Sequence, residues 1–263
     1  MSRQALLEAL RSDPARTAIL TDVDGTLAPI VERPELAEVP AAASHVLAQL
    51  GERYGLVACI SGRPAEEARR LVGVEEIAYA GNHGLELLRP GEEAPRRAPA
   101  LHGHERDAAE FVSTLDPATL AEAELRLEDK GPIQALHWRG AGDEASAEAL
   151  AEKIATAAEA AGMAPRRGRK VLELRPTAGG GKEAAVAALL ADGDMRAAAY
   201  AGDDRTDLDA FRQLRELRRR GELETAVCVG IASAEGPSEL AQEADLTVDR
   251  LGCWLEILES LAR

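Results

Sequence analysis

The chain has 263 residues and a formal net charge of -15, and 46% of its residues are hydrophobic while only 3% are aromatic. This length accommodates one large α/β domain or a core domain with a smaller cap, with a core filled mainly by Ala, Leu and Val. The acidic balance argues against nucleic acid and anionic membranes as partners, because both are bound by basic surfaces. An anionic small-molecule substrate would need a metal ion and a few Lys or Arg side chains at its site.

The three cysteines, Cys59, Cys228 and Cys253, are odd in number and widely spaced, which is not typical of a disulfide framework. The first ten residues lack the apolar segment of a signal peptide, and no apolar run reaches the length that a membrane span needs. We therefore expect reduced thiols in a soluble, cytoplasmic protein. The oligomeric state is not predicted by the sequence.

In the first part of the chain, short apolar runs alternate with helical patterns. This alternation is typical of βαβ units that build a parallel sheet. Its predicted strands cover residues 17–21, 56–60 and 77–80, and its predicted helices cover residues 40–50 and 64–71.

The middle of the chain has a different pattern, with apolar and charged residues alternating along short segments. Such alternation indicates an antiparallel sheet with one charged face and one face that packs on helices. Strands are predicted at 124–130, 133–139 and 169–175, and a helix at 147–158. We interpret residues 86–176 as an inserted α+β cap domain.

The βαβ pattern resumes after Pro176. Helices are predicted at 182–190, 207–219 and 251–261, and strands at 197–201, 227–231 and 246–248. The predicted fold is therefore an α/β core of residues 1–85 and 177–263, with a parallel sheet, helices on both faces and the cap inserted into it.

Two carboxylates, Asp22 and Asp24, directly follow the first predicted strand in the segment DVDGT. Open α/β sheets place their ligands at the carboxyl ends of strands. A carboxylate at such a position can attack phosphorus and form an aspartyl-phosphate, and a second carboxylate can serve as acid and base. An acidic turn without function is the alternative interpretation of this segment alone.

Two other strand ends carry groups suited to a phosphoryl oxygen. Ser61 follows the second strand and begins a helix, where its hydroxyl and the helix amides can bind an anion, although an ordinary helix cap has the same sequence. Lys182 follows three glycines and can neutralise a phosphoryl charge. A Walker A loop is excluded there by Glu183 and Pro176, and a surface lysine remains the alternative.

Three acids, Asp203, Asp204 and Asp207, lie within five positions after the strand predicted at 197–201. Like charges at this spacing repel one another, and a hard divalent cation with oxygen ligands relieves the repulsion. A capped helix start would explain only one of the three acids.

Together these segments resemble, in order, the four motifs of the haloacid dehalogenase superfamily. Within it, the chain is similar to trehalose-6-phosphate phosphatases. The segments that carry this resemblance are 20–29, 61–63, 82–86, 128–130, 137–139, 173–176 and 202–207, which extend over nearly the whole chain. Leu208 and Glu183 depart from the family pattern.

The resemblance implies a role for each matching residue. Asp22 would be the nucleophile and Asp24 the acid and base, with Ser61 and Lys182 at the phosphoryl group. The implied Mg²⁺ would be held by Asp22, the backbone carbonyl of Asp24, and Asp203, with Asp204 and Asp207 in support. Substrate binding is assigned to Arg63, His83, Glu128, Lys130, Arg139, Arg169 and Glu173.

The function predicted from the resemblance is Mg²⁺-dependent hydrolysis of trehalose 6-phosphate to trehalose and phosphate. Another sugar-phosphate phosphatase, of the sucrose-phosphate or mannosyl-phosphoglycerate type, is the nearest alternative, and a mutase shares the core. A phosphosugar-binding protein without catalysis is an alternative from another class. The pair of Asp22 and Asp24 argues against it, because binding alone needs no acid and base.

Overall fold

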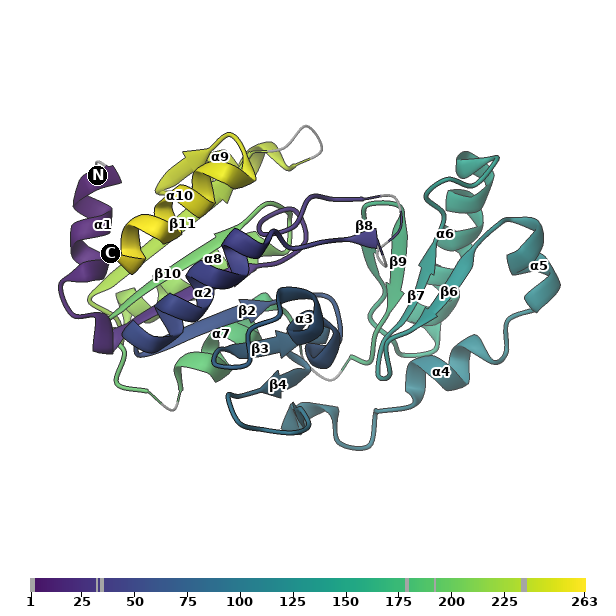
Figure 1. The fold of residues 1–263 in the computed structure, drawn as a ribbon. Helices are drawn as coiled ribbons and strands as arrows, with labels where there is room; N and C mark the ends of the chain where they lie inside the picture. The colour runs from purple at the N-terminus through teal and green to yellow at the C-terminus, as the bar shows by residue number, and fades with distance from the viewer. Residues whose placement is uncertain (1–2, 32, 34–35, 178–179, 192, 233–235) are drawn as a thin grey trace. The chain divides into compact units, whose positions relative to one another are not determined.

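The computed structural model describes residues 3–31, 33, 36–177, 180–191, 193–232 and 236–263. The chain divides into two compact units (Figure 1). Unit 1 comprises Met1–Arg97 and Gly180–Arg263, and unit 2 comprises Ala98–Gly179. Among the described residues, no helix has the length and apolar character needed to cross a membrane.

Unit 1 is built on an eight-stranded sheet in the order β12-β11-β10-β1-β2-β3-β4-β5. The first six strands of this order are parallel, and β4 and β5 extend the sheet in antiparallel pairing. The strands are β1 Thr17–Asp22, β2 Leu56–Ile60, β3 Ala78–Gly81, β4 Glu86–Leu88, β5 Arg96–Arg97, β10 Ala197–Gly202, β11 Thr225–Ile231 and β12 Leu246–Val248.

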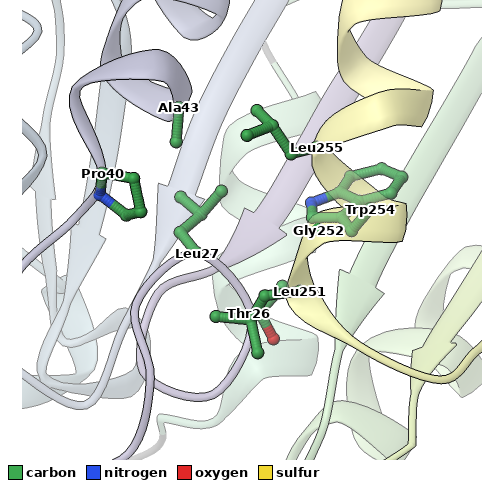
Figure 2. Close-up of a pocket in the computed structure, with 8 residues that line it drawn as sticks. All are labelled: Thr26, Leu27, Pro40, Ala43, Leu251, Gly252, Trp254 and Leu255. Atoms are coloured by element: carbon green, nitrogen blue, oxygen red, sulfur yellow. The ribbon is translucent and has the colours of Figure 1, made fainter.

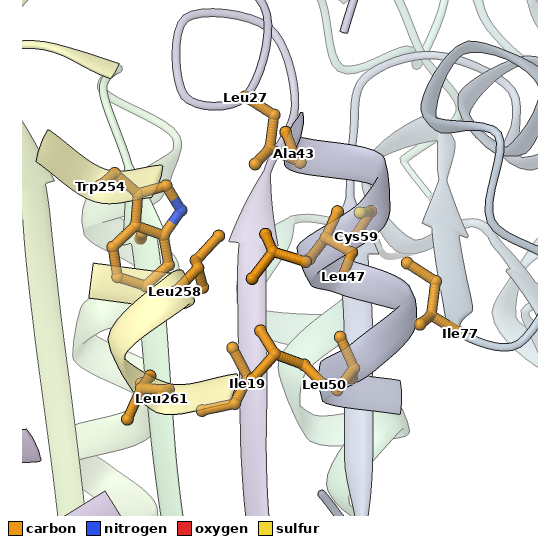
Figure 3. Packing of buried hydrophobic residues seen from close by; sticks show 14 of the residues in the cluster. Ile19, Leu27, Ala43, Leu47, Leu50, Cys59, Ile77, Trp254, Leu258 and Leu261 are labelled. Atoms are coloured by element: carbon orange, nitrogen blue, oxygen red, sulfur yellow. The ribbon is translucent and has the colours of Figure 1, made fainter. Parts of the chain in front are cut away.

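Successive strand residues point to opposite faces of the sheet. Both faces of this sheet carry apolar residues, and helices cover both. On one face, Ile19 packs in a cluster with Leu47, Leu50 and Trp254, as Figure 3 shows. This cluster draws on α1 Arg3–Arg11, α2 Ala41–Arg53, α3 Ala65–Val72 and α10 Leu251–Ala262. The opposite face packs on α7 Lys182–Leu190, α8 Asp207–Arg219 and α9 Ser238–Glu243.

The two-sided cover explains why the central strands are almost continuously apolar. All six residues of β1 are buried, as are all six of β10. Because β1, β2 and β10 run parallel, their carboxyl ends meet at one edge of the sheet, where the loops that carry the predicted catalytic residues begin.

Unit 2 contains an antiparallel four-stranded sheet in the order β6-β7-β9-β8. One face packs on the long helix α6, with Leu136 and Leu172 of the sheet meeting Ala151 and Ile154 of the helix. The elements are α4 Asp107–Val112, α5 Pro117–Glu122, β6 Arg126–Asp129, β7 Gln134–His137, α6 Glu144–Ala160, β8 Arg166–Gly168 and β9 Val171–Leu174.

The structure confirms the predicted fold class and revises two of its details. The boundary predicted at residue 86 falls too early, because β4 and β5 pair with the sheet of unit 1 rather than with unit 2. The strand predicted at 169–175 begins only at Val171. Arg169 and Lys170 form the turn between β8 and β9, and Lys170 has a φ of 59° there.

Candidate active site

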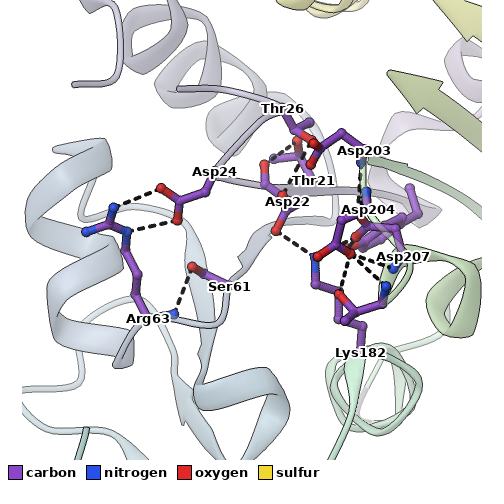
Figure 4. Close-up of polar contacts among 12 residues, drawn as sticks. Thr21, Asp22, Asp24, Thr26, Ser61, Arg63, Lys182, Asp203, Asp204 and Asp207 are labelled. Atoms are coloured by element: carbon purple, nitrogen blue, oxygen red, sulfur yellow. Dashed lines mark hydrogen bonds and ion pairs between the residues drawn. The ribbon is translucent and has the colours of Figure 1, made fainter. Parts of the chain in front are cut away.

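Polar side chains gather at the carboxyl edge of the parallel sheet in unit 1 (Figure 4). Asp22 is the last residue of β1, and Asp203 directly follows β10. Ser61 directly follows β2, and Lys182 is the first residue of α7. All four residues are buried. The structure therefore brings together the nucleophile, phosphate-binding and metal-binding residues that the sequence suggested, although they come from distant segments.

Lys182 forms the centre of a buried charge network. Its Nζ lies 2.7 Å from Asp22 Oδ1 and 2.5 Å from Asp207 Oδ1. Burial alone would lower the pKa of the Lys182 amine, but the charges of Asp207 and Asp22 outweigh it and hold this pKa well above its usual range. Lys182 is therefore a fixed positive charge beside Asp22.

Asp207 has donors on both carboxylate oxygens. Its Oδ1 accepts hydrogen bonds from Lys182 Nζ and from the hydroxyl of Tyr200, each at 2.5 Å. Its Oδ2 accepts the backbone N–H groups of Asp203 and Asp204, each at 2.8 Å. A Cβ on Gly202 would lie 2.1 Å from the Asp207 carboxyl carbon, so only glycine permits this approach. Asp207 thus fixes the loop that presents Asp203.

Three carboxylates are close enough to share a cation. Ligand oxygens of Asp22, Asp203 and Asp207 all lie within 4.8 Å of one another, which is the one such group found among the described residues. Burial, followed by the charges of Asp207 and Asp203, raises the pKa of Asp22 well above its usual range against the opposing effect of Lys182. A divalent cation with oxygen ligands would reverse this repulsion, so the donor set fits Mg²⁺.

Within this acidic cluster the five predicted metal ligands have different surroundings. Asp22 and Asp203 suit direct coordination best, because four donors already surround the Asp207 carboxylate. Asp204 is outside the group and turns back on its own loop, where its Oδ1 accepts hydrogen bonds from the backbone and hydroxyl of Thr206. Despite burial, Lys182 and these hydrogen bonds lower the pKa of Asp204. Coordination through the carbonyl of Asp24 stays a prediction.

Glycine is also required beside this group. Gly25 has a φ of 94°, and a Cβ there would lie 2.3 Å from Asp203 Oδ2. The loop after β1 therefore passes directly against the carboxylate that follows β10. This close approach brings the loop after Asp22 to Asp203, a predicted metal ligand.

Asp24 is held by Arg63. Arg63 Nε donates to Asp24 Oδ2 and Nη2 donates to Oδ1, both at 2.8 Å, and Nη1 forms an ion pair with Glu67. This two-point contact engages both oxygens of the predicted general acid. Arg63 therefore binds the side chain of Asp24. The assignment of Arg63 to substrate binding stays a prediction.

The predicted substrate residue His83 lies in a strained turn after β3. Asn82 and His83 have φ values of 48° and 54°, which are uncommon for residues other than glycine. The backbone N–H of His83 donates to the carbonyl of Ser61, and that of Asn82 donates to the carbonyl of Arg63. A Cβ on Gly62 would lie 2.7 Å from His83 Nε2. The turn therefore packs directly on the loop that carries Ser61.

An apolar cavity of about 80 Å³ lies beside Thr26 and Leu27, which follow the two aspartates in the sequence (Figure 2). It is lined by residues that include Leu27, Ala43 and Trp254, and Thr26 contributes its hydroxyl-bearing side chain. A phosphate is bound by cations and N–H donors. The polar edge of the sheet, where Lys182 lies beside Asp22, is therefore a better candidate for the reaction site than this apolar cavity.

In unit 2, charged side chains gather on the sheet face opposite to α6. Lys130 Nζ lies 3.1 Å from Glu173 Oε1 and 3.8 Å from Glu128 Oε2. Glu128 and Glu173 both lie opposite Ala135 in register, so they share this face. Arg139 Nη2 donates to the carbonyl of Arg169 at 3.4 Å. Within unit 2, the structure thus brings the predicted sugar-binding residues Glu128, Lys130 and Glu173 together.

Two residues with contacts at these sites were not predicted from the sequence. Tyr200 donates to Asp207, and His137 Nε2 lies 2.7 Å from Glu128 Oε2. A tyrosine inside an alanine-rich strand was a signal that could have found the first. His137 stood within the segment that carried the resemblance, but was given no role.

The family model described as Trehalose-phosphatase matches residues 20–249 of the chain. Trehalose-phosphate phosphatase B of Arabidopsis thaliana is 34% identical over 208 residues, which are 74% of this chain and 55% of the plant protein. An uncharacterised glycosyl hydrolase of Mycobacterium tuberculosis is 35% identical over 207 residues, which are 76% of this chain but only 15% of that protein. The chain thus spans only part of these relatives.

Among solved structures, the C-terminal domain of trehalose-6-phosphate phosphatase from C. albicans matches with a TM-score of 0.81 at 21% identity. The match covers 99% of this chain and 97% of that domain. At this identity the match establishes a common fold across both units of the chain.

Proposed function

Because the chain belongs to the trehalose-phosphatase family, we propose that it is a Mg²⁺-dependent phosphatase that hydrolyses trehalose 6-phosphate. The observation that carries the proposal is the buried contact of Lys182 with Asp22, beside the carboxylates of Asp203 and Asp207. A fixed cation, a nucleophilic carboxylate and a group of metal-binding oxygens are the components that phosphoryl transfer requires.

In the first step, an oxygen of Asp22 attacks phosphorus as the bond from phosphorus to the sugar oxygen breaks. The product is an aspartyl-phosphate on Asp22 and free trehalose. Lys182 offsets the charge on the phosphoryl oxygens, and Ser61 donates its hydroxyl to one of them. Mg²⁺, held by Asp22 and Asp203, would supply further charge neutralisation at the phosphoryl group.

Asp24 donates the proton that the leaving sugar oxygen takes up. In the arrangement described above, both of its oxygens accept hydrogen bonds from Arg63, so Asp24 must turn away from Arg63 to act as an acid. In the second step Asp24 takes a proton from water, which attacks phosphorus and releases inorganic phosphate from Asp22.

The sugar is assigned to the charged side chains of unit 2. Glu128, Lys130 and Glu173 offer acceptors and a donor for sugar hydroxyl groups, and they lie together on one face of the unit 2 sheet. The resemblance assigns the same role to Arg139 and Arg169, but Arg169 stands where fungal relatives have Lys. A cytoplasmic location stays a prediction.

A panel of substrates tests the proposal: trehalose 6-phosphate, sucrose 6-phosphate, glucose 6-phosphate and an aryl phosphate, each with Mg²⁺ and with excess chelator. We expect kcat/KM to be highest for trehalose 6-phosphate, and chelator to abolish phosphate release until Mg²⁺ is restored. A preference for sucrose 6-phosphate would make that compound the assigned substrate in place of trehalose 6-phosphate. Full activity in chelator would refute the metal requirement. Binding of the sugar phosphate without phosphate release would favour a non-catalytic protein.

A further inference from the structure

Tyr200 is an exception within its strand. β10 has the sequence AAAYAG, so Tyr200 is its only large side chain. The ring is fully buried and meets Phe211 edge to face, with 5.9 Å between ring centroids. A phenylalanine would fill the same space, so packing explains the ring but not the hydroxyl.

The hydroxyl of Tyr200 connects to the nucleophile through two charged groups. It donates to Asp207 Oδ1 at 2.5 Å, and the same oxygen accepts a hydrogen bond from Lys182 Nζ. Lys182 Nζ in turn lies 2.7 Å from Asp22 Oδ1. We propose that Tyr200 is a positioning residue of the phosphoryl-transfer site, which orients Asp207 and thereby places Lys182 against Asp22.

The physical argument rests on the shared acceptor oxygen. In a dry site, each lone pair of Asp207 needs a donor, and the hydroxyl of Tyr200 supplies one beside Lys182. Without that hydroxyl, Lys182 is drawn toward Asp207 and away from Asp22. The charge of Lys182 matters most when charge shifts in the transition state, and small displacements are costly there. Tyr200 therefore acts on kcat rather than on substrate binding.

The chain provides a matched control in Tyr79. Tyr79 is also fully buried in the sheet of unit 1, and its hydroxyl donates to the backbone carbonyl of Val74. It lies in the hydrophobic cluster on the opposite face from the cluster that contains Tyr200. Tyr79→Phe and Tyr200→Phe thus remove the same atom from equally buried rings, but only one of those atoms contacts the charge network.

The test measures kcat, KM and melting temperature of the full chain with Mg²⁺, using trehalose 6-phosphate and an aryl phosphate. We expect Tyr200→Phe to lower kcat about ten-fold on both substrates with KM within about two-fold, because the lost hydrogen bond is to a charged group. Tyr79→Phe should keep kcat within about two-fold of the wild type. Equal kcat values for the two variants would overturn the proposal, as would a Tyr200→Phe protein that fails to fold.

A second measurement tests the path through Lys182. In a Lys182→Met background, adding Tyr200→Phe should change the residual kcat by less than about two-fold, because the group that Tyr200 places is then absent. A further ten-fold loss would show that Tyr200 acts by another route and would refute the proposal.

This inference rests on the proposed function, and its failure can be told apart from failure of that function. If the wild type releases no phosphate from any substrate in the panel, the proposed function fails and the inference fails with it. If the wild type is active and Tyr200→Phe matches it, only the positioning role is lost.

Discussion

The charged cluster of unit 1 and that of unit 2 are built in different ways. Around Asp207, backbone amides and buried side chains occupy both carboxylate oxygens. Around Lys130, the ion pairs are between side chains of β6, of the turn that follows it and of β9, which lies on the other side of β7 in the same small sheet. The first arrangement holds the carboxylate of Asp207 by four hydrogen bonds, which suits the exact placement of groups that phosphoryl transfer requires. The second can adjust its side chains without moving the backbone, which suits recognition of hydroxyl groups.

If this contrast is correct, substitutions in unit 1 should impair every substrate, whereas those in unit 2 should impair only the sugar phosphate. The largest effect is expected for Asp22→Asn. Loss of a nucleophile should lower kcat by about 10⁴–10⁶-fold on both trehalose 6-phosphate and an aryl phosphate, as measured by phosphate release. An Asp22→Asn protein with near wild-type rates would refute the covalent mechanism.

Asp24→Asn is expected to have the second largest effect. General acid and base assistance contributes about 10²–10⁴-fold, so kcat on trehalose 6-phosphate should fall by that factor. The loss should be smaller on an aryl phosphate, whose leaving group needs less protonation. Leaving-group dependence can be measured with a series of aryl phosphates, and equal losses on sugar and aryl substrates would contradict the acid role.

Mg²⁺ should stabilise unit 1 without any substrate. Burial raises the pKa of Asp22 in the folded protein. The contribution of Asp22 to stability is therefore greatest at a pH below its pKa in the unfolded chain, and it is lost as the pH rises through its pKa in the folded protein. A cation that pairs with the ionised carboxylates compensates at neutral pH. At a Mg²⁺ concentration about 100 times its Kd, we expect the free energy of unfolding to rise by about 2.7 kcal/mol, which corresponds to a rise in Tm of about 5–10 °C.

The pH dependence of this Mg²⁺ effect supplies the control. The rise in Tm should be smaller at pH 5 than at pH 7.5, because protons compete with the cation for the carboxylates. Asp203→Asn should remove most of the rise at both pH values. An unchanged rise in that variant, measured by thermal unfolding, would place the cation elsewhere.

Of Asp22→Asn, Asp24→Asn and Glu173→Ala, the substitution of Glu173 in unit 2 is expected to cause the smallest loss of activity. Glu173→Ala removes a charged hydrogen-bond acceptor, which costs about 1.5–3 kcal/mol, so kcat/KM on trehalose 6-phosphate should fall roughly ten- to a hundred-fold. Hydrolysis of an aryl phosphate should barely change. Because Glu173 also contacts Lys130 and Arg175, Tm must be measured on the same preparation.

Glu152→Ala is the matched variant for Glu173→Ala. Glu152 forms an ion pair with Arg167, which lies in register with buried Leu172 and therefore on the helix-covered face of the same sheet. Glu152→Ala should leave the hydrolysis of both substrates unchanged. An equal loss on sugar and aryl phosphate in Glu173→Ala, or a large drop in Tm beyond that of Glu152→Ala, would assign Glu173 to the stability of unit 2.

The sequence predicted the elements whose apolar pattern is strong. The strands 56–60 and 246–248 and the helices 182–190 and 207–219 have the bounds that the structure shows. It did not predict β8 Arg166–Gly168, which contains two arginines and a glycine and exists because it pairs with β9. Segments of this kind are stabilised by their neighbours in space, which one sequence does not reveal.

The sequence also predicted only part of the candidate site. Whereas Lys182 was identified by its place after three glycines, spacing after strands identified Asp22 and Asp203, because parallel strand ends converge. It could not tell that Asp207 would be surrounded by four donors, since these come from α7, β10 and the loop after it. The departure at Leu208 is explained by packing, because Leu208 is buried between α8 and the sheet.

The order of strands in unit 1 also has a consequence for how the protein folds. Thr17 of β1 pairs with Ala197 of β10, and this pairing brings Asp22 to Asp203. During synthesis, β1 can pair with β2 early, but it can pair with β10 only after most of the chain has been synthesised, whereas all strands of unit 2 have been synthesised by then. Pairing of β1 with β10 is therefore expected to be a late step in folding, and the candidate active site cannot form until it occurs.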